Sequence, residues 1–249
     1  MELTENSKRE YERIFKNRKA ELSETDPEFI EIFNNFAFDE VVNQDGLDDK
    51  TRFMAILATL IGCQGIDEYK VMLGAALNSG VTPAEVKETV YQSVAYLGIG
   101  RAFPFLKATN EVLTERGIKL PLEGQSTTTH ETRLEAGERA QIDIFGEGMR
   151  GFANSGNPET RHINKWLVDN CFGDYYTRNG LDYKHREMIT FCFLAAQGGC
   201  EPQLISHAKA NIRIGNGKAF LIKVVSQCLP YIGYPRSLNA LRCVEEAAK

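Results

Sequence analysis

Three side chains able to exchange protons or electrons lie close together in the C-terminal half of the chain: Glu187, Cys200 and His207. The glycine pair at 198–199 is expected to end one helix, and Pro202 suits the first turn of the next. Cys200 therefore lies at a helix N-terminus, where exposed amide groups favour a thiolate and the carboxylate of the following residue opposes it. His207 follows seven residues later, close to two helical turns, so that both side chains can line one pocket.

Glu187 belongs to the helix that precedes this turn. If that helix folds back antiparallel to the next one, its carboxylate can approach His207 and orient or charge the imidazole. A glutamate and a histidine in contact form a proton-transfer unit. Each residue also has an alternative structural role. His207 could be hydrogen-bonded within a helix interface, Cys200 could be a buried inert thiol, and Glu187 could be a solvated carboxylate in the first turn of its helix. Taken together, the three residues are the candidate catalytic set.

The elements that must position these residues occur twice. Residues 46–54 (GLDDKTRFM) recur as residues 180–188 (GLDYKHREM), at an offset of 134. Further on, at an offset of 135, Gln92, Tyr96, Gly98 and Arg101 return as Gln227, Tyr231, Gly233 and Arg236. The polar segment 117–137 between the repeats is expected to be a linker. We therefore divide the chain into one copy at 1–120 and a second copy at 136–249.

Helical signals run through both copies. Apolar residues from Phe53 to Ile61 fall on one face at 3.6-residue spacing, and Asp48 stands where the N-cap of that helix should be. The segment 82–85 (TPAE) combines an N-cap threonine, a first-turn proline and the glutamate of a capping box. No convincing alternating strand pattern appears. The sequence predicts an all-α fold in which two copies of a helical unit pack through their apolar faces.

Composition narrows the class of protein. The chain has 249 residues and a net charge of −5, with charges interspersed and no basic blocks, which argues against binding to nucleic acid or an anionic membrane. No apolar run approaches the roughly 20 residues of a membrane span. The first residues contain no apolar core for a signal peptide, so a cytoplasmic protein is expected.

Six cysteines are present, and no two of them are three residues apart. They are expected to be reduced thiols, because small secreted scaffolds place cysteines far more densely. The spacing provides neither a CxxC redox pair nor a zinc knuckle. No metal and no organic cofactor is expected.

A family resemblance rests on four motifs of the second copy: residues 181–188, the Gly-Gly-Cys at 198–200, His207, and residues 231–236. This pattern resembles the carboxymuconolactone decarboxylase family, which also contains the alkylhydroperoxidase D-type proteins. The first copy resembles the family over residues 47–52, 78–86 and 92–98. The resemblance implies two tandem alkylhydroperoxidase D-like domains packed as a pseudo-dimer. It also implies a homo-oligomer, which for a two-copy chain would be a trimer.

The chain departs from one branch of that family. Alkylhydroperoxidase-type members use a CxxC pair with a histidine and a glutamate; here Cys200 and His207 match the first cysteine and the histidine, but Gln203 holds the second cysteine's place. A single thiol cannot close a disulfide at that motif. Decarboxylase-like members do not require the CxxC pair, so this chain fits that branch better.

The first copy has lost the same residues. Phe53 stands in place of the glutamate, and Met72 or Leu73, depending on where the gap falls, stands in place of the histidine. We expect its site to be without chemistry, with the copy kept for packing and for lining the second site.

The resemblance favours a carboxymuconolactone-decarboxylase-like enzyme that acts on a small carboxylated lactone or a related organic acid. His207 would donate a proton or polarise the lactone, Glu187 would set the protonation state of the imidazole, and Cys200 would line the pocket. Arg186 or Arg236 could bind the substrate carboxylate, although a surface ion pair is an alternative role for each.

Two other functions remain open. In the first, Cys200 forms a sulfenic acid on reaction with peroxide, as in a single-cysteine, peroxiredoxin-type protein, and another thiol resolves it; Cys192 is the nearest candidate in sequence. In the second, the chain is a non-catalytic helical protein that binds a ligand or a partner, having kept the fold after losing the chemistry.

Overall fold

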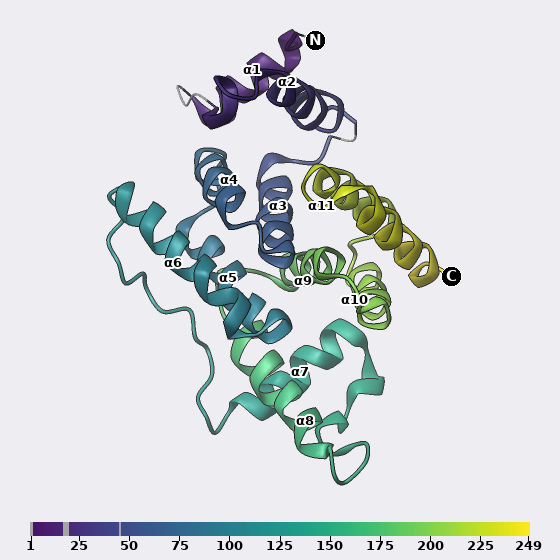
Figure 1. Ribbon diagram of the computed structural model, residues 1–249. Helices are drawn as coiled ribbons and strands as arrows, with labels where there is room; N and C mark the ends of the chain where they lie inside the picture. Colours follow the sequence, from purple (N-terminus) through teal and green to yellow (C-terminus); the bar gives the residue numbers. More distant parts are fainter. Residues whose placement is uncertain (1, 17–19, 45) are drawn as a thin grey trace.

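The computed structural model describes residues 2–16, 20–44 and 46–249, and in these ranges the chain forms helices and no β-strand (Figure 1). The predicted all-α fold is confirmed. In the N-terminal half the helices are α1 (Glu5–Phe15), η1 (Glu21–Ser23), α2 (Pro27–Asn35), η2 (Phe36–Glu40), α3 (Asp49–Cys63), α4 (Ile66–Asn78), α5 (Pro83–Leu97) and α6 (Ile99–Glu115). In the C-terminal half they are α7 (Arg133–Phe145), η3 (Glu147–Met149), η4 (Phe152–Asn154), α8 (Arg161–Trp166), η5 (Leu167–Tyr176), α9 (Tyr183–Gln197), α10 (Glu201–Arg213) and α11 (Lys218–Ala247).

The duplication seen in the sequence is a duplication of helices. α3 and α9 each contain 15 residues, and α4 and α10 each contain 13. α11 corresponds to α5 and α6 together: it continues through Gly233 at φ 75° and ψ 170°, where α5 gives way to α6 at Gly98 with φ 78° and ψ 155°. The one-residue shift in offset falls in the turn between α9 and α10, which is the turn that carries Cys200.

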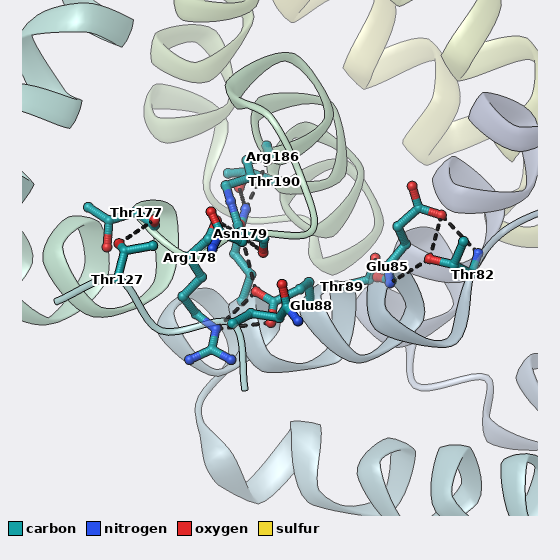
Figure 2. A network of polar contacts seen from close by, with 12 residues as sticks. Thr82, Glu85, Glu88, Thr89, Thr127, Thr177, Arg178, Asn179, Arg186 and Thr190 are labelled. Atoms are coloured by element: carbon teal, nitrogen blue, oxygen red, sulfur yellow. Dashed lines mark hydrogen bonds and ion pairs between the residues drawn. The ribbon is translucent and has the colours of Figure 1, made fainter. Parts of the chain in front are cut away.

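Helix starts lie where the sequence predicts them. The side chain of Asp48 accepts a hydrogen bond from the backbone N–H of Thr51 at 3.0 Å, as an N-cap does. Thr82 and Glu85 form both hydrogen bonds of the capping box at the start of α5 (Figure 2). These local contacts fix where the chain enters α3 and α5.

The two copies share one core. α3 and α9 cross at the centre of the molecule, α5 of the first copy packs on α9, and α11 of the second copy packs on α3 (Figure 1). At the crossing, a Cβ atom on Gly62 would lie 2.8 Å from the Cβ of Ala196, so the two helices approach as closely as the glycine allows. Each copy therefore completes the packing of the other.

The segment between the copies is shorter than predicted. α6 ends at Glu115 and α7 already begins at Arg133, inside the stretch 117–137 that the sequence suggests is a linker. Gly137 belongs to helix α7, where a Cβ atom would lie 2.0 Å from the carbonyl oxygen of Val168. The absence of a side chain at Gly137 lets α7 approach η5 closely. In the sequence, this glycine makes the end of the segment 117–137 resemble a loop. None of the described helices is long and apolar enough to cross a bilayer.

Candidate active site

Glu187 and His207 meet between α9 and α10. Their side chains project from the second turns of the two helices, and Oε2 of Glu187 lies 2.8 Å from Nδ1 of His207. The glutamate side chain is fully buried and the histidine side chain is 11% exposed. The predicted approach of the two residues is confirmed. The alternative role of Glu187 as a solvated first-turn carboxylate is wrong, because the second turn of α9 faces the core.

Hydroxyl groups surround the other oxygen of this carboxylate. Tyr176 donates to Oε1 of Glu187 at 2.7 Å. Because a tyrosine hydroxyl has one hydrogen, Tyr176 must accept from its two remaining neighbours, Tyr96 and Thr190, each at 2.8 Å. Gln92 in turn donates to Thr190 at 2.9 Å. The network thus directs its hydrogens toward Oε1 of Glu187.

The first copy supplies part of this network. Tyr96 lies at the end of α5, and its hydroxyl reaches across to Tyr176 of the second copy. Burial raises the pKa of both phenols well above the ordinary value, and the charge of Glu187 raises each pKa further. Both tyrosines therefore stay protonated at neutral pH and act as hydrogen-bond donors.

The imidazole is held between two aromatic rings. The centroids of Tyr96 and Phe145 each lie 5.4 Å from that of His207, with both rings nearly perpendicular to it. Asn211 donates to the backbone carbonyls of Glu187 and His207 at 3.0 and 2.8 Å, which ties α10 to α9. Nδ1 is occupied by Glu187, and Nε2 has no hydrogen-bond partner among the described residues. Nε2 is therefore the nitrogen that can meet a ligand.

Cys200 occupies the N-cap position of α10, as predicted. Its sulfur lies 3.5 Å from the carbonyl oxygen of Leu194 and 3.7 Å from Nε2 of Gln197. In the described part of the chain, no hydrogen bond or ring contact joins Cys200 to the Glu187 and His207 pair. The thiol lies in the turn that joins the two helices carrying Glu187 and His207, and it forms no part of their hydrogen-bond network.

The thiol is not activated. Burial raises the pKa of Cys200 and the negative charge of Glu201 adds to this effect, while the hydrogen bond from Gln197 and the charge of Arg236 lower the pKa by less. The net shift of the Cys200 pKa is upward. The sequence leaves open whether the helix N-terminus or the neighbouring carboxylate has the larger effect on this thiol, and the structure favours the protonated thiol.

Comparison with known proteins shows the family of this chain. The carboxymuconolactone decarboxylase family matches residues 27–111 and residues 162–246, once in each copy. This chain belongs to the carboxymuconolactone decarboxylase family. It is 31% identical over 103 residues to a 4-carboxymuconolactone decarboxylase of Acinetobacter baylyi, a match that covers 41% of this chain and 77% of the relative.

A solved structure extends the likeness to the whole chain. It is that of a Burkholderia xenovorans protein provisionally described as a gamma-carboxymuconolactone decarboxylase subunit. The TM-score is 0.56 at 22% identity, with 97% of this chain and 95% of the other covered. The family fold therefore extends over both copies, and the two tandem alkylhydroperoxidase D-like domains predicted from the sequence are confirmed.

The first family unit contains a counterpart of the site without the ionisable pair. α4 and α10 have equal lengths at an offset of 135, so Met72, and not Leu73, takes the place of the histidine. Phe53 takes the place of the glutamate, and both of these side chains are fully buried. The hydroxyl of Tyr231, the repeat of Tyr96, lies 3.8 Å from the sulfur of Met72. A cavity of about 820 Å³ adjoins this counterpart site, and its walls include Tyr11, Phe33, Phe38 and Tyr231.

The two arginines considered as carboxylate ligands differ in their surroundings. Arg186 is fully buried, and its guanidinium donates to Gln92 at 2.8 Å, to Glu88 at 3.0 Å, and to backbone carbonyls at residues 178 and 179. Arg186 forms no surface ion pair and cannot reach a substrate. Both roles predicted for it, as a ligand of the substrate carboxylate and as a partner in a surface ion pair, are therefore wrong. Arg236 is exposed, and no carboxylate of the described residues forms an ion pair with it.

Cys192 has a partner other than Cys200. It is buried on α9 at 1% exposure, and the thiol that influences it is that of Cys228 on α11. The hydroxyl of Thr59 also donates to the sulfur of Cys228 at 2.9 Å. Burial raises the pKa of Cys192 well above the ordinary value. The proposed role of Cys192 as the thiol that resolves an oxidised Cys200 has no support in this arrangement.

Sequence reasoning misses three residues of the site: Tyr96, Tyr176 and Phe145. Tyr96 carries a usable signal, because it recurs as Tyr231 in the duplicated block. Tyr176 lies in the irregular helical segment η5 and carries no comparable signal.

Metal-ligating side chains are scattered over the part of the chain that the structure describes. Nowhere there do three or more of His, Cys, Asp and Glu come together in a group that could hold a metal ion. The candidate site itself offers one carboxylate and one imidazole.

Proposed function

We propose that this chain is a carboxymuconolactone-decarboxylase-like enzyme that acts on a small carboxylated lactone or a related organic acid. The observation that carries the proposal is the contact of 2.8 Å between Glu187 and His207, buried on the glutamate side and reachable on the histidine side. The activity named for the relative in Acinetobacter baylyi supports the choice of substrate class.

The reaction requires one proton. The bond between the ring carbon and the carboxylate breaks, CO₂ leaves, and the electron pair of that bond moves into the conjugated lactone. A proton then adds to a carbon atom of the resulting enolate-like system. His207, protonated at Nε2, is the donor, and the neutral imidazole left behind takes up a proton from solvent before the next turnover.

The carboxylate of Glu187 makes this donor available. By accepting a hydrogen bond from Nδ1, it fixes the ring orientation and stabilises the imidazolium. Tyr176 and Tyr96 hold the carboxylate in place, and their protonated hydroxyls are donors that cannot compete as bases. Glu187 and the two tyrosines are therefore positioning residues, and His207 is the proposed catalytic residue.

The direct test is turnover of a carboxylated lactone. Purified protein is mixed with gamma-carboxymuconolactone, and the loss of substrate absorbance and the release of CO₂ are followed together. We expect one CO₂ for each lactone consumed. Absence of CO₂ release at enzyme concentrations comparable to the substrate concentration would contradict the proposal.

Peroxide chemistry at Cys200 is the less favoured function, because the raised pKa keeps the thiol protonated at neutral pH. Alkylation of Cys200 by iodoacetamide, followed by mass spectrometry of the native protein, is expected to be slow at pH 7. It should accelerate only above pH 9, the ordinary value from which the pKa is raised. Cys200→Ser should leave lactone turnover unchanged. Fast labelling below neutral pH that peroxide pretreatment abolishes would instead favour the redox function.

The first copy is proposed to be catalytically silent. Met72 and Phe53 can neither give nor take a proton, so its counterpart site has no acid or base at the two decisive positions. What the copy contributes is Tyr96 and the helix that carries it. The chain would then have one active site built from both copies.

We further propose that the chain forms a homo-oligomer, with a trimer as the expected state. Large apolar side chains are exposed at equivalent positions of both copies, and residues that are more than half exposed form four such pairs. The pairs are Phe29 with Ile163, Ile32 with Trp166, Ile99 with Tyr234, and Phe103 with Leu238. Apolar patches repeated in this way are typical of subunit interfaces.

The oligomer can be tested at one of these positions. Phe103, 53% exposed, is expected to be covered in the trimer, so Phe103→Glu should shift the mass measured by light scattering from three chains toward one. Phe103→Tyr is the matched control and should leave the mass unchanged. A wild-type mass of one chain would contradict the proposal.

A further inference from the structure

A second cavity lies at the opposite end of α5 from Tyr96. It has a volume of about 370 Å³ and is enclosed by α5, by Asn110 of α6, by residues 120–125 and by Arg178. We call it the linker cavity, because residues 120–125 belong to the segment that joins the copies. Neither Glu187 nor His207 lines it. Its size falls within the range of small-molecule sites.

One wall of the linker cavity carries a buried cation. Lys87 is 9% exposed, and its ammonium group hydrogen-bonds Asn110 and lies 5.7 Å from the ring centroid of Tyr91. No carboxylate of the described residues forms an ion pair with it. Burial lowers the pKa of Lys87, with no acidic group acting in the other direction. A buried ammonium without a counter-ion is unfavourable, and an anion placed beside it would relieve that cost.

A second cation lies on the same wall. The guanidinium carbon of Arg178 is 5.3 Å from the ring centroid of Tyr91, so one tyrosine ring faces both Lys87 and Arg178. Nε of Arg178 donates to both oxygens of Glu88 at 3.0 Å, and neither terminal nitrogen of Arg178 has a hydrogen-bond partner in the described part of the chain. Two donor groups therefore remain for a ligand.

The charges around the cavity do not balance. Glu88, 1% exposed, is shared between Arg178 and the fully buried Arg186 (Figure 2). The cavity lining thus holds two cations, Lys87 and Arg178, and Glu88, the one buried carboxylate among the lining residues, is already shared with Arg186. The other acid of the cavity wall, Glu123, is exposed to solvent, so its charge is screened. The interior of the linker cavity therefore has an excess of positive charge.

We propose that the linker cavity binds a small organic carboxylate, with its head group between Lys87 and Arg178. Residues 120–122 (Leu-Pro-Leu), which also line the cavity, are apolar and suit a hydrocarbon body. Combined with the two cations, these residues favour an aromatic or aliphatic acid over inorganic phosphate. The site is separate from the Glu187 and His207 pair and stands whether or not the chain is a decarboxylase.

The test uses benzoate as the probe, benzamide as its neutral counterpart, and inorganic phosphate, each titrated calorimetrically into the full chain. Benzoate should bind, and the other two should bind at least about tenfold more weakly, because benzamide lacks the negative charge for the two cations and phosphate lacks a hydrocarbon body for the apolar residues. Lys87→Met, which has a similar length and removes an uncompensated buried charge, should fold normally and weaken benzoate binding about tenfold or more. Lys70→Met removes an exposed lysine paired with Glu111 and should leave binding unchanged.

Each alternative outcome is distinguishable. If Lys87→Met still binds benzoate, the ligand lies elsewhere and the proposal is overturned. The same holds if His207→Ala loses benzoate binding while Lys87→Met retains it. Absence of benzoate binding to the wild-type chain would also overturn it. Equal affinity for phosphate and benzoate would show that the apolar residues do not select the ligand, against the proposed class. Retention of binding in His207→Ala together with its loss in Lys87→Met is the expected result.

Discussion

His207→Ala is expected to lower kcat for decarboxylation of the carboxylated lactone by roughly 10²- to 10⁴-fold, the range that a positioned general acid contributes. The variant removes the nitrogen Nε2, which meets no described protein group, and leaves Glu187 its hydrogen bond from Tyr176. Because the proton is delivered to the enolate-like intermediate and not to the bound lactone, the loss should appear in kcat more than in KM. Initial rates measured across substrate concentrations separate the two.

A matched control is present on the adjacent helix. His185 is partly exposed, and its ring Nδ1 and its backbone N–H both contact Oδ1 of Asp182, the N-cap residue of α9. His185→Ala should retain full turnover. Glu187→Gln should lower kcat at least about tenfold and alter its pH profile, because the amide cannot stabilise an imidazolium by charge. An unaltered pH profile with an intact kcat would show that Glu187 has only a structural role. A His207→Ala enzyme with near wild-type kcat would remove the histidine from the mechanism.

The pairing of Glu187 with His207 could be predicted from sequence because it depends on local rules. The glycines at 198–199 end α9, Pro202 begins α10, and a short turn forces the two helices to run antiparallel. In such a pair, residues at comparable distances from the connecting turn come close together, and Glu187 lies ten residues before the end of α9 while His207 lies six residues after the start of α10. The same rules predicted the caps of α3 and α5.

The hydroxyl network could not be predicted, since it joins residues that are distant in sequence. Tyr96 comes from the other copy, 80 residues from Tyr176, with which it shares a hydrogen bond. Tyr176 lies in an irregular helical segment whose side-chain directions do not follow the 3.6-residue period. Neither periodicity nor composition indicates that such a pair will meet.

Arg186 shows a second limit of sequence reasoning. A charged residue in a polar motif is ordinarily expected at the surface, where an arginine pairs weakly with its neighbours. Here its burial depends on Glu88 and Gln92 of α5, which lie 98 and 94 residues away in sequence. The packing of the first copy against the second decides the environment of this residue.

This buried charge cluster gives the largest stability effect that we expect. Glu88→Gln should lower the free energy of unfolding by roughly 3–5 kcal/mol, the range for removing one partner of a buried ion pair. Glu88 and Arg186 are 1% and 0% exposed, and their closest atoms lie 3.0 Å apart. The glutamine keeps the shape but not the charge, so Arg186 would stay buried without a counter-ion. Urea denaturation followed by circular dichroism measures the change.

The exposed pair of Lys70 and Glu111 provides the comparison. It has a similar distance, 2.8 Å, but both side chains are about half exposed at 45% and 51%, so Glu111→Gln should change the unfolding free energy by less than about 1 kcal/mol. The double variant Glu88→Gln with Arg186→Met should recover part of the lost stability, since it leaves no unpaired charge between α5 and α9. If Glu88→Gln were no more destabilising than Glu111→Gln, the buried cluster would not be what holds α5 of the first copy against α9 of the second. The position of Tyr96 beside His207 would then have to depend on apolar packing and on the hydrogen bonds of Gln92 and Tyr96 to the second copy.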